Sequence, residues 1–375
     1  MERNMEEIMV SLSPEGQAFF GNRSQPNPSQ ASDMIEATIE QPCEDLNLTD
    51  MGNARRLVLK HGENLRYCWE NKEWLVWNGL VWEPGSNAKV VEMAKDTVRN
   101  MYLEAYESED PGKRNELASH ARKSESNHRI KSMIELAKSD PAIVVKAHEL
   151  NTNPMLLNCQ NGNLDLRTGI LLPHNKDHLI TKIVPVAFNP EATCPNWERH
   201  LRRITANDDD LISYLQRVFG YCLTGLNKEQ VFFICWGPSK TGKSVTQRTM
   251  RWLLGDYGAT TSSATLLSKK NETHSDLARI VGSRMVEAVE TEEGQRLNAP
   301  MIKAITGNDR IAARFLYCEN TEFEPTFKIF LATNDKPIVR GEDSAIWERL
   351  KLIPFTQYIP PEERERLRLR TSRTI

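Results

Sequence analysis

Apolar residues recur at three- and four-residue intervals along much of the first half of this chain, a spacing typical of amphipathic helices. Asn87–Glu107 is one such segment. We also predict helices over Ala54–His61, Arg129–Lys138 and Ala142–Leu150. Asp110–Gly112, which contains proline and glycine, breaks the helical pattern between them.

Strand patterns follow in two places. Glu73–Trp77 and Leu80–Trp82 are joined by Asn-Gly, which predicts a β-hairpin because both turn residues tolerate positive φ. Met155–Leu172 alternates short apolar runs with Asn-Gly and Thr-Gly turns, which predicts a small β meander. These elements predict a smaller α+β domain over residues 51–190. Residues 1–50 are polar and interrupted by prolines, and we expect a disordered tail there.

The tryptophans around the predicted hairpin allow two interpretations. Trp69, Trp74, Trp77 and Trp82 would suit a platform on which nucleic-acid bases stack. Such a cluster is more often the apolar core of a small domain, and we favour the core.

After residue 190 the pattern changes to helices and buried strands. Pro195–Ile204 and Asp209–Thr224 are predicted helices, and the acids at 208–210 suit a helix start better than a metal site. Continuous apolar runs then predict strands over Val231–Trp236, Arg284–Glu290 and Thr326–Asn334, with a further one after Arg349. With helices between them, these strands predict an α/β fold whose mainly parallel sheet carries helices on both faces.

The loop after the first of these strands carries a phosphate-binding pattern, G-x-x-x-x-G-K-[ST], known as the P-loop. Its glycines let successive N–H groups point at an anion, and the next helix adds its positive N-terminal end. A strand before it and a helix after it argue against a chance match. We predict an ATP and Mg²⁺ site in which Lys243 reaches the phosphates and Ser244 holds the metal. The predicted cofactor-binding residues are Gly237, Pro238, Ser239, Lys240, Thr241, Gly242, Lys243 and Ser244.

Polar residues near the ends of the later strands complete a candidate ATPase site. Glu290, with Glu292 or Glu293, follows a strand and would hold Mg²⁺ and polarise water, although a solvated acidic loop has the same pattern. Asn334 would contact the γ-phosphate or the water, although such residues are usually turn formers. Arg349 would reach a neighbouring subunit's ATP, although a surface salt bridge is the simpler interpretation.

Composition narrows the class of partner and compartment. The 375 residues carry a net charge of −3, so any contact with DNA must be a local patch. The sequence contains no apolar run of transmembrane length and no N-terminal signal peptide, so we expect no membrane partner. The seven cysteines are scattered without a C-x-x-C pair, which indicates reduced thiols rather than disulfides or a zinc ribbon.

These motifs together resemble the ATPase domain of superfamily 3 DNA helicases, and more narrowly the phage/plasmid DNA primase–helicase family. The resemblance is collinear and covers about residues 51–360. Asn53–Trp82 and residues 161–169 resemble the helical N-terminal region of that family. The matching ATPase segments are Gly237–Ser244, Arg284–Asn298, Ile302–Asp309, Arg314–Tyr317, Pro325–Asn334 and Ile346–Phe355.

The resemblance implies an AAA+-like ATP hydrolase that acts as a DNA helicase in replication of a phage, plasmid or other mobile element. It implies a hexameric ring with ATP between subunits, acting on single-stranded or forked DNA in the cytoplasm of a bacterial or phage-infected cell. Carried over by residue, Lys243 and Ser244 are the Walker A pair, Glu290 with Glu292 or Glu293 the Walker B acids, Asn334 the sensor, and Arg349 the arginine finger, with Arg340 as second choice.

The resemblance also implies a hairpin that touches DNA in the pore of the ring. Ile311–Phe323 is that segment, and Lys303, Arg310 and Arg314 are its nearby cations. The chain departs from the family at Cys318–Glu322, which is acidic where positive charge is expected.

The ATPase domain is expected over residues 191–358, followed by a charged tail over residues 359–375. Family members continue into a winged-helix segment, so we expect a C-terminally truncated chain that also lacks the primase domain. The alternative function is an ATP-binding DNA-binding or loading module that does not unwind DNA. A P-loop ATPase or kinase unrelated to DNA fits the collinear motifs less well.

Overall fold

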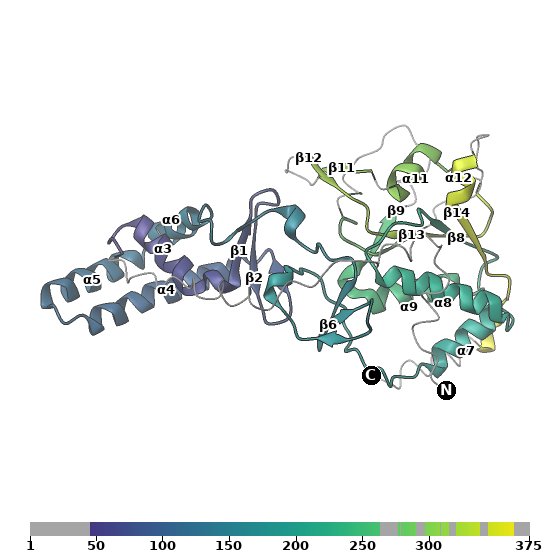
Figure 1. Ribbon diagram of the computed structural model, residues 1–375, viewed down its shortest axis with the longest axis horizontal. Helices are drawn as coiled ribbons and strands as arrows, with labels where there is room; N and C mark the ends of the chain where they lie inside the picture. The colour runs from purple at the N-terminus through teal and green to yellow at the C-terminus, as the bar shows by residue number, and fades with distance from the viewer. Residues whose placement is uncertain are drawn as a thin grey trace, which may run out of the picture. The chain divides into compact units, whose positions relative to one another are not determined.

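The computed structural model describes residues 46–262, 277, 279–289, 297–307, 309–314, 320–337 and 344–363. The chain divides into two compact units, traced in Figure 1. The first combines the segment ending at Gly62 with Val90–Ala142, and the second combines Glu63–Lys89 with the chain from Ile143 onward. The domain boundaries expected from the sequence stay predictions.

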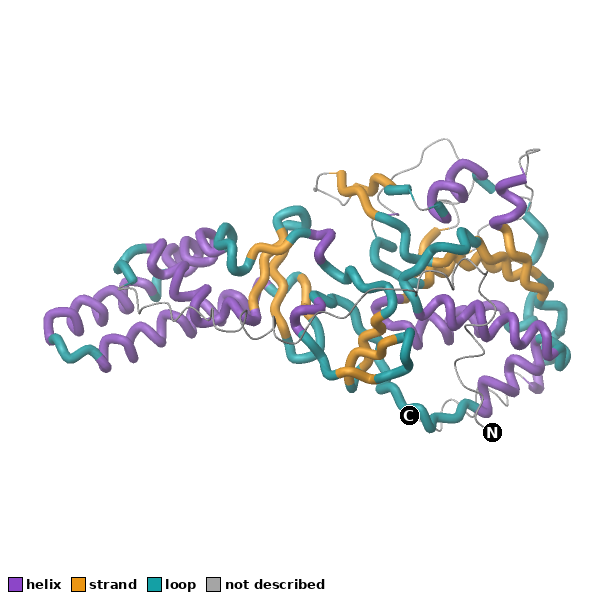
Figure 2. The backbone as a smooth tube through the Cα atoms, in the orientation of Figure 1, coloured by secondary structure: helices purple, strands orange, loops and turns teal. Residues whose placement is uncertain are grey.

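The first unit is helical (Figure 2). Side chains start its helices: Thr49 accepts a hydrogen bond from the Gly52 N–H at 3.1 Å, and Ser126 caps the last helix. Asp110 caps another, with proline in the first turn, so the predicted break at 110–112 is also a helix start. The helices are α3 (Asp50–His61), α4 (Asn87–Glu107), α5 (Pro111–Ser124) and α6 (Asn127–Ala137), which confirms three predicted helices.

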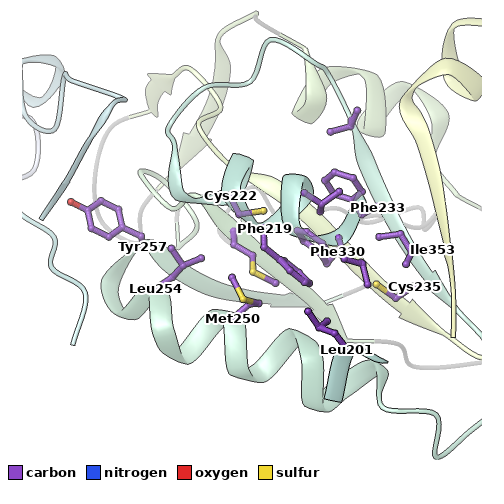
Figure 3. Packing of buried hydrophobic residues seen from close by; sticks show 14 of the residues in the cluster. Leu201, Phe219, Cys222, Phe233, Cys235, Met250, Leu254, Tyr257, Phe330 and Ile353 are labelled. Atoms are coloured by element: carbon purple, nitrogen blue, oxygen red, sulfur yellow. The ribbon is translucent and has the colours of Figure 1, made fainter. Parts of the chain in front are cut away.

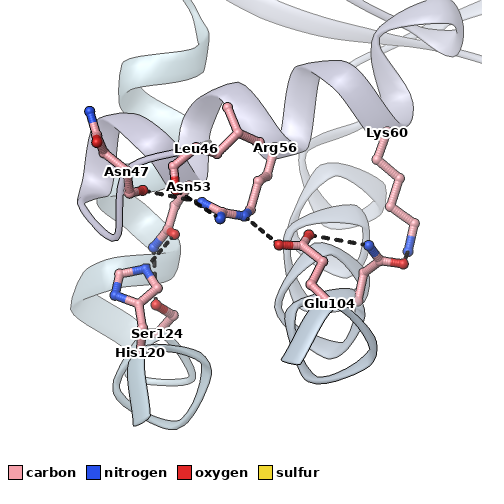
Figure 4. A network of polar contacts seen from close by, with 9 residues as sticks. Leu46, Asn47, Asn53, Arg56, Lys60, Glu104, His120 and Ser124 are labelled. Atoms are coloured by element: carbon pink, nitrogen blue, oxygen red, sulfur yellow. Dashed lines mark hydrogen bonds and ion pairs between the residues drawn. The ribbon is translucent and has the colours of Figure 1, made fainter. Parts of the chain in front are cut away.

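Buried polar side chains join these helices (Figure 4). The Arg56 side chain on α3 is buried, and its Nε donates to Glu104 on α4 at 3.0 Å. Its remaining nitrogens donate to the carbonyls of Leu46 and Asn47, at 3.0 and 3.2 Å. The buried charge is therefore paired and hydrogen-bonded, as a low-dielectric site requires.

His120 on α5 is held as a neutral ring in the same network. Its Nε2 lies 2.7 Å from Asn53 Oδ1, and the Asn53 amide donates to Ser124 Oγ at 3.0 Å. Because that amide oxygen accepts, His120 Nε2 carries the proton, and Nδ1 accepts from Arg129 at 3.4 Å. Burial, then the charges of Arg129 and Arg56, lower the pKa of His120.

The second unit begins with a four-stranded sheet of order β3-β2-β1-β4. The predicted hairpin is confirmed, because β2 and β3 pair antiparallel. Trp74 and Trp82 are buried, and Trp82 Nε1 donates to the Lys176 carbonyl at 2.7 Å, which fits the core interpretation; Trp69 is exposed. The strands are β1 (Leu65–Cys68), β2 (Glu73–Trp77), β3 (Trp82–Pro84) and β4 (Val144–Val145).

The helix predicted over Ala142–Leu150 is wrong. Val144 and Val145 form β4 and pair parallel with Tyr67 and Cys68 of β1. A 3-10 turn, Ala147–Glu149, follows. Pairing with β1 supplies hydrogen bonds that the local pattern of apolar residues does not contain, and β-branched valines suit a strand.

The predicted meander is confirmed as a three-stranded antiparallel sheet, β5-β6-β7. A separate antiparallel hairpin, β11-β12, matches the segment expected to face DNA. The bounds are β5 (Leu156–Cys159), β6 (Gly162–Asp165), β7 (Leu171–Leu172), β11 (Ile311–Arg314) and β12 (Asn320–Phe323), with further 3-10 turns at Gly62–Asn64, Lys176–His178 and Gly255–Tyr257.

A five-stranded sheet of order β14-β8-β13-β10-β9 carries the predicted site. All neighbouring strands in it are parallel, which confirms the expected parallel sheet. The strands are β8 (Phe232–Trp236), β9 (Gly258–Ser262), β10 (Met285–Val289), β13 (Lys328–Thr333) and β14 (Leu350–Pro354).

Helices cover both faces of this sheet. On β8, Phe233 and Cys235 point into one apolar cluster, shown in Figure 3, which includes residues of α7, α8 and α9. Phe232 and Ile234 point the other way, into a cluster with residues of α11 and α12. The alternation follows from the two-residue period of a strand. The helices are α7 (Pro195–Ile204), α8 (Asp209–Leu223), α9 (Lys243–Leu254), α11 (Ala299–Thr306) and α12 (Ser344–Arg349).

A buried lysine fixes the connection that leads from α8 into β8. Lys328, at the start of β13, is fully buried, and its Nζ donates to the carbonyls of Thr224 at 2.6 Å and Leu226 at 3.2 Å. The ammonium also lies 4.6 Å from the centre of the Tyr221 ring. Burial lowers the pKa of Lys328 to about 7. Strand β8 is thus anchored at the end opposite the predicted phosphate-binding loop.

Candidate nucleotide-binding site

The predicted phosphate-binding loop lies where β8 ends and α9 begins. The carboxyl ends of β13 and β14 flank it, because both strands run parallel to β8. The Gly237 N–H donates to the Thr333 carbonyl at 3.2 Å, and the Phe355 N–H donates to the Trp236 carbonyl at 2.7 Å. The loop is therefore held by the strands on both sides of β8.

Two glycines of the loop occupy places where a side chain does not fit. Gly237 has φ of 153°, and a Cβ there would lie 1.8 Å from the Phe355 carbonyl oxygen. Gly242 has φ of 95°, and a Cβ there would lie 2.8 Å from Ile204 Cγ2. Both positions favour glycine on backbone conformation as well as on space. The pattern of glycines thus has a geometric cause in this fold.

Lys243 and Asn334, predicted from separate motifs, meet at the loop. Lys243 is 8% exposed, and its Nζ donates to Asn334 Oδ1 at 3.1 Å. The same ammonium donates to the Pro238 carbonyl at 2.7 Å and to the Gly237 carbonyl. A positive charge is therefore fixed over the loop, beside an amide from the neighbouring strand.

The residues around the loop fit the phosphates of a nucleotide. Helix α9 starts at Lys243, so its first N–H groups and its positive end face the loop. Ser244, in the first turn, is exposed and suits one Mg²⁺ position. No group of His, Cys, Asp and Glu side chains within the described ranges could hold a metal alone.

A histidine from α7 stabilises the loop through a hydrogen bond to Thr246 of α9. His200 Nε2 lies 2.8 Å from Thr246 Oγ1, and that hydroxyl lies 3.1 Å from the Gly242 carbonyl, to which it donates. The hydroxyl therefore accepts from His200, whose pKa is lowered by burial. The Ile359 N–H donates to the Lys240 carbonyl at 2.9 Å from the other side. The sequence does not predict these supports, because no local motif marks them.

Arg349 lies at the opposite end of the sheet from the loop. It ends α12 directly before β14, whose residue Leu350 pairs with Phe232 at the start of β8. At about 3.3 Å per residue, the length of β14 separates Arg349 from the loop by roughly 15 Å. Its Nη1 donates to Thr306 Oγ1 at 3.0 Å. Arg349 therefore does not reach the loop of its own chain.

The remaining predicted residues are only partly placed. Lys303 lies on α11, and Arg310, next to β11, forms a 3.5 Å ion pair with the exposed Glu324. Arg314 belongs to β11, but its side chain lies outside what the structure describes. The predicted acids and the second-choice finger also lie outside the described residues: Glu290, Glu292, Glu293 and Arg340.

Comparisons with known proteins find similarity to one family model and to several viral proteins. Residues 54–206 match the family model described as D5 N terminal like. The chain is similar to a protein of Acanthamoeba polyphaga mimivirus provisionally named a helicase, with 31% identity covering 55% of this chain and 22% of the relative. A provisionally named helicase of Frog virus 3 is 33% identical, covering 35% of this chain and 14% of the relative.

A provisionally named primase of African swine fever virus is 29% identical, covering 54% of this chain and 22% of the relative. The chain therefore spans less than a quarter of the length of these relatives. Among solved structures, an apo C-terminal region of NrS-1 is 10% identical, with a TM-score of 0.47, covering 85% of this chain and 66% of that one. The family model and the relatives support a primase–helicase family.

No helix in the part of the chain that the structure describes has the length and apolar character needed to cross a membrane.

Proposed function

We propose that this chain binds and hydrolyses ATP between the subunits of a ring and uses that reaction to unwind DNA during replication of a viral or other mobile element. The observation that carries the proposal is the contact between Lys243 and Asn334 at the glycine loop, 3.1 Å between Nζ and Oδ1. The viral relatives named helicase or primase support the choice of DNA as substrate.

Different residues of the chain have different roles in this proposed site. The glycine loop and the start of α9 bind the phosphates, and the Lys243 ammonium stabilises the charge that develops on the transferred phosphoryl group. Ser244 would hold Mg²⁺, which would supply additional neutralisation of the phosphate charge. Asn334 orients the γ-phosphate or the attacking water. Arg349 completes the site of a neighbouring copy.

The proposal is tested by measuring ATP hydrolysis with and without single-stranded DNA. Wild-type turnover should rise when DNA is added. Lys243→Ala should lower turnover by about 10²-fold or more, because it removes a charge that acts on the transition state. The matched control is Lys89→Ala, whose partly exposed ammonium pairs with Glu83 at 2.5 Å and contributes little to stability.

Two results would contradict the proposal. Wild-type ATP turnover in Lys243→Ala would show that the glycine loop does not take part in ATP hydrolysis. ATP turnover that does not change when DNA is added would indicate an ATPase that does not act on DNA. Strand displacement on a forked duplex then separates unwinding from loading, because a loading module hydrolyses ATP without separating the strands.

A further inference from the structure

Thr306, the last residue of α11, makes a hydrogen bond that the proposed reaction does not yet explain. Its side chain is 2% exposed, and its hydroxyl donates to the Ile302 carbonyl at 2.6 Å. Since that hydrogen is used, the oxygen accepts the bond from Arg349 Nη1 at 3.0 Å. The bond joins the last residues of α11 and α12, which both lie on the same face of the sheet.

Asn227 holds the end of α11 from the other side. It is buried in the connection between α8 and β8, and its Nδ2 donates to the carbonyls of Thr306 at 3.1 Å and Gly307 at 3.0 Å. These bonds satisfy carbonyls that a helix end leaves without intrahelical partners. The Thr306 hydroxyl is therefore fixed by its own helix and by the segment that enters β8.

We propose that Thr306 is a positioning residue for Arg349 and holds the guanidinium in the orientation needed to reach the nucleotide of a neighbouring copy. This inference rests on the proposed function. A guanidinium carries five N–H donors, so one bond to Thr306 restrains its position and leaves most of its donor capacity for phosphate oxygens. An arginine that is already oriented loses less side-chain entropy when it engages the phosphates.

The geometry also explains why a hydroxyl suits this position. A carboxylate would neutralise the guanidinium and compete with phosphate for it. A hydroxyl orients the arginine while leaving its charge intact, and the buried backbone around Thr306 keeps that hydroxyl in one place. The substitution Thr306→Val keeps the shape of the side chain and removes the acceptor, whereas Thr306→Ser keeps the acceptor.

The experiment measures ATP turnover of these two variants beside Arg349→Ala, with urea unfolding as a check on folding. Thr306→Val should lower kcat roughly ten-fold, because a hydrogen bond to a charged group is lost, and should leave the KM for ATP nearly unchanged. Thr306→Ser should stay within about two-fold of wild type. In the Arg349→Ala background, Thr306→Val should cause no further loss, because the two residues act as one unit.

The outcomes separate this inference from the function on which it rests. If Arg349→Ala loses turnover while Thr306→Val keeps it, Thr306 does not position the arginine, and the proposed function stands. If Thr306→Val loses turnover further in the Arg349→Ala background, its effect does not pass through Arg349, and the inference is wrong. Wild-type turnover in Arg349→Ala would overturn both. Should Thr306→Val fail to fold, Thr306→Ala removes the same acceptor without putting a methyl group in place of the hydroxyl.

Discussion

At Gly237 the chain passes so close to Phe355 that the loop depends on the absence of a side chain. We expect Gly237→Ala to lower the free energy of unfolding by at least about 2 kcal/mol, because the new Cβ is both strained and overlapped by a backbone carbonyl. Urea unfolding measures this change. ATP binding should weaken in parallel, since the loop must move to relieve the overlap.

Gly220 gives a matched control in the same unit. It lies in the interior of α8, and a Cβ there would meet nothing within 4 Å. Gly220→Ala should therefore raise the free energy of unfolding by roughly 0.5–1 kcal/mol. If both alanine variants changed stability alike, the close approach at Gly237 would not be what requires glycine.

The residues of the site differ in how far the sequence predicts them. Lys243 belongs to a local motif, and Asn334 follows a strand, so parallel strands bring both to one edge of the sheet. Thr306 and His200 are ordinary residues on helices. Thr306 contacts Arg349, and His200 contacts Thr246. Both contacts join residues that are distant in sequence, so local sequence patterns do not predict them.

At the scale of elements, a titratable histidine links helices of the helical unit. The neutral His120 ring lies between Asn53 and Arg129, and Asp50 and Lys123 also affect its pKa. Its pKa is lowered from 6.5 on folding, so the unfolded chain binds the proton more tightly. The free energy of unfolding should therefore fall as the pH drops below about 6.5, and level off below the folded-state pKa.

His120→Gln tests this expectation. The glutamine amide can donate to Asn53 and accept from Arg129, but it does not titrate. Urea unfolding between pH 8 and pH 5 should show a smaller loss of stability in the variant than in wild type. A residual slope is expected from the other groups whose pKa is lowered on folding: His61, His200 and Lys328, the last to about 7. Identical slopes in the two proteins would show that His120 does not contribute.

Elements with strong local patterns were predictable, and those made by pairing were not. The spacing within Asn87–Glu107 gives α4 with the same bounds. Val144–Val145 forms a strand because β1 lies beside it, and its apolar character alone fits a helix equally well. The parallel sheet was predictable as a class, but its strand order depends on crossovers between segments that are distant in sequence.

At the scale of the whole molecule, Arg349 and the glycine loop lie at opposite ends of the sheet, so a complete proposed site needs two copies. Lys243→Ala and Arg349→Ala should each be inactive alone. Co-assembled in equal amounts, they should regain activity at roughly a quarter of interfaces, where an intact loop meets an intact arginine from its neighbour. ATP turnover across a series of mixing ratios measures this.

Mixtures without any recovery would contradict a shared site. The control mixes each variant with wild type instead, where activity should fall smoothly with the fraction of variant. Recovery in the doubly mutant mixture and decline in the control together would assign the loop and the arginine to different copies.

The strand order of the central sheet has a consequence for synthesis of the chain. Strand β8 is almost wholly apolar and buried, yet its neighbours β13 and β14 begin only at Lys328 and Leu350. A ribosome adding about 5–20 residues per second needs on the order of ten seconds to make them. During that interval β8 has emerged without either partner. The nascent chain therefore exposes an apolar segment that chaperones can bind, well before the glycine loop beside it can fold.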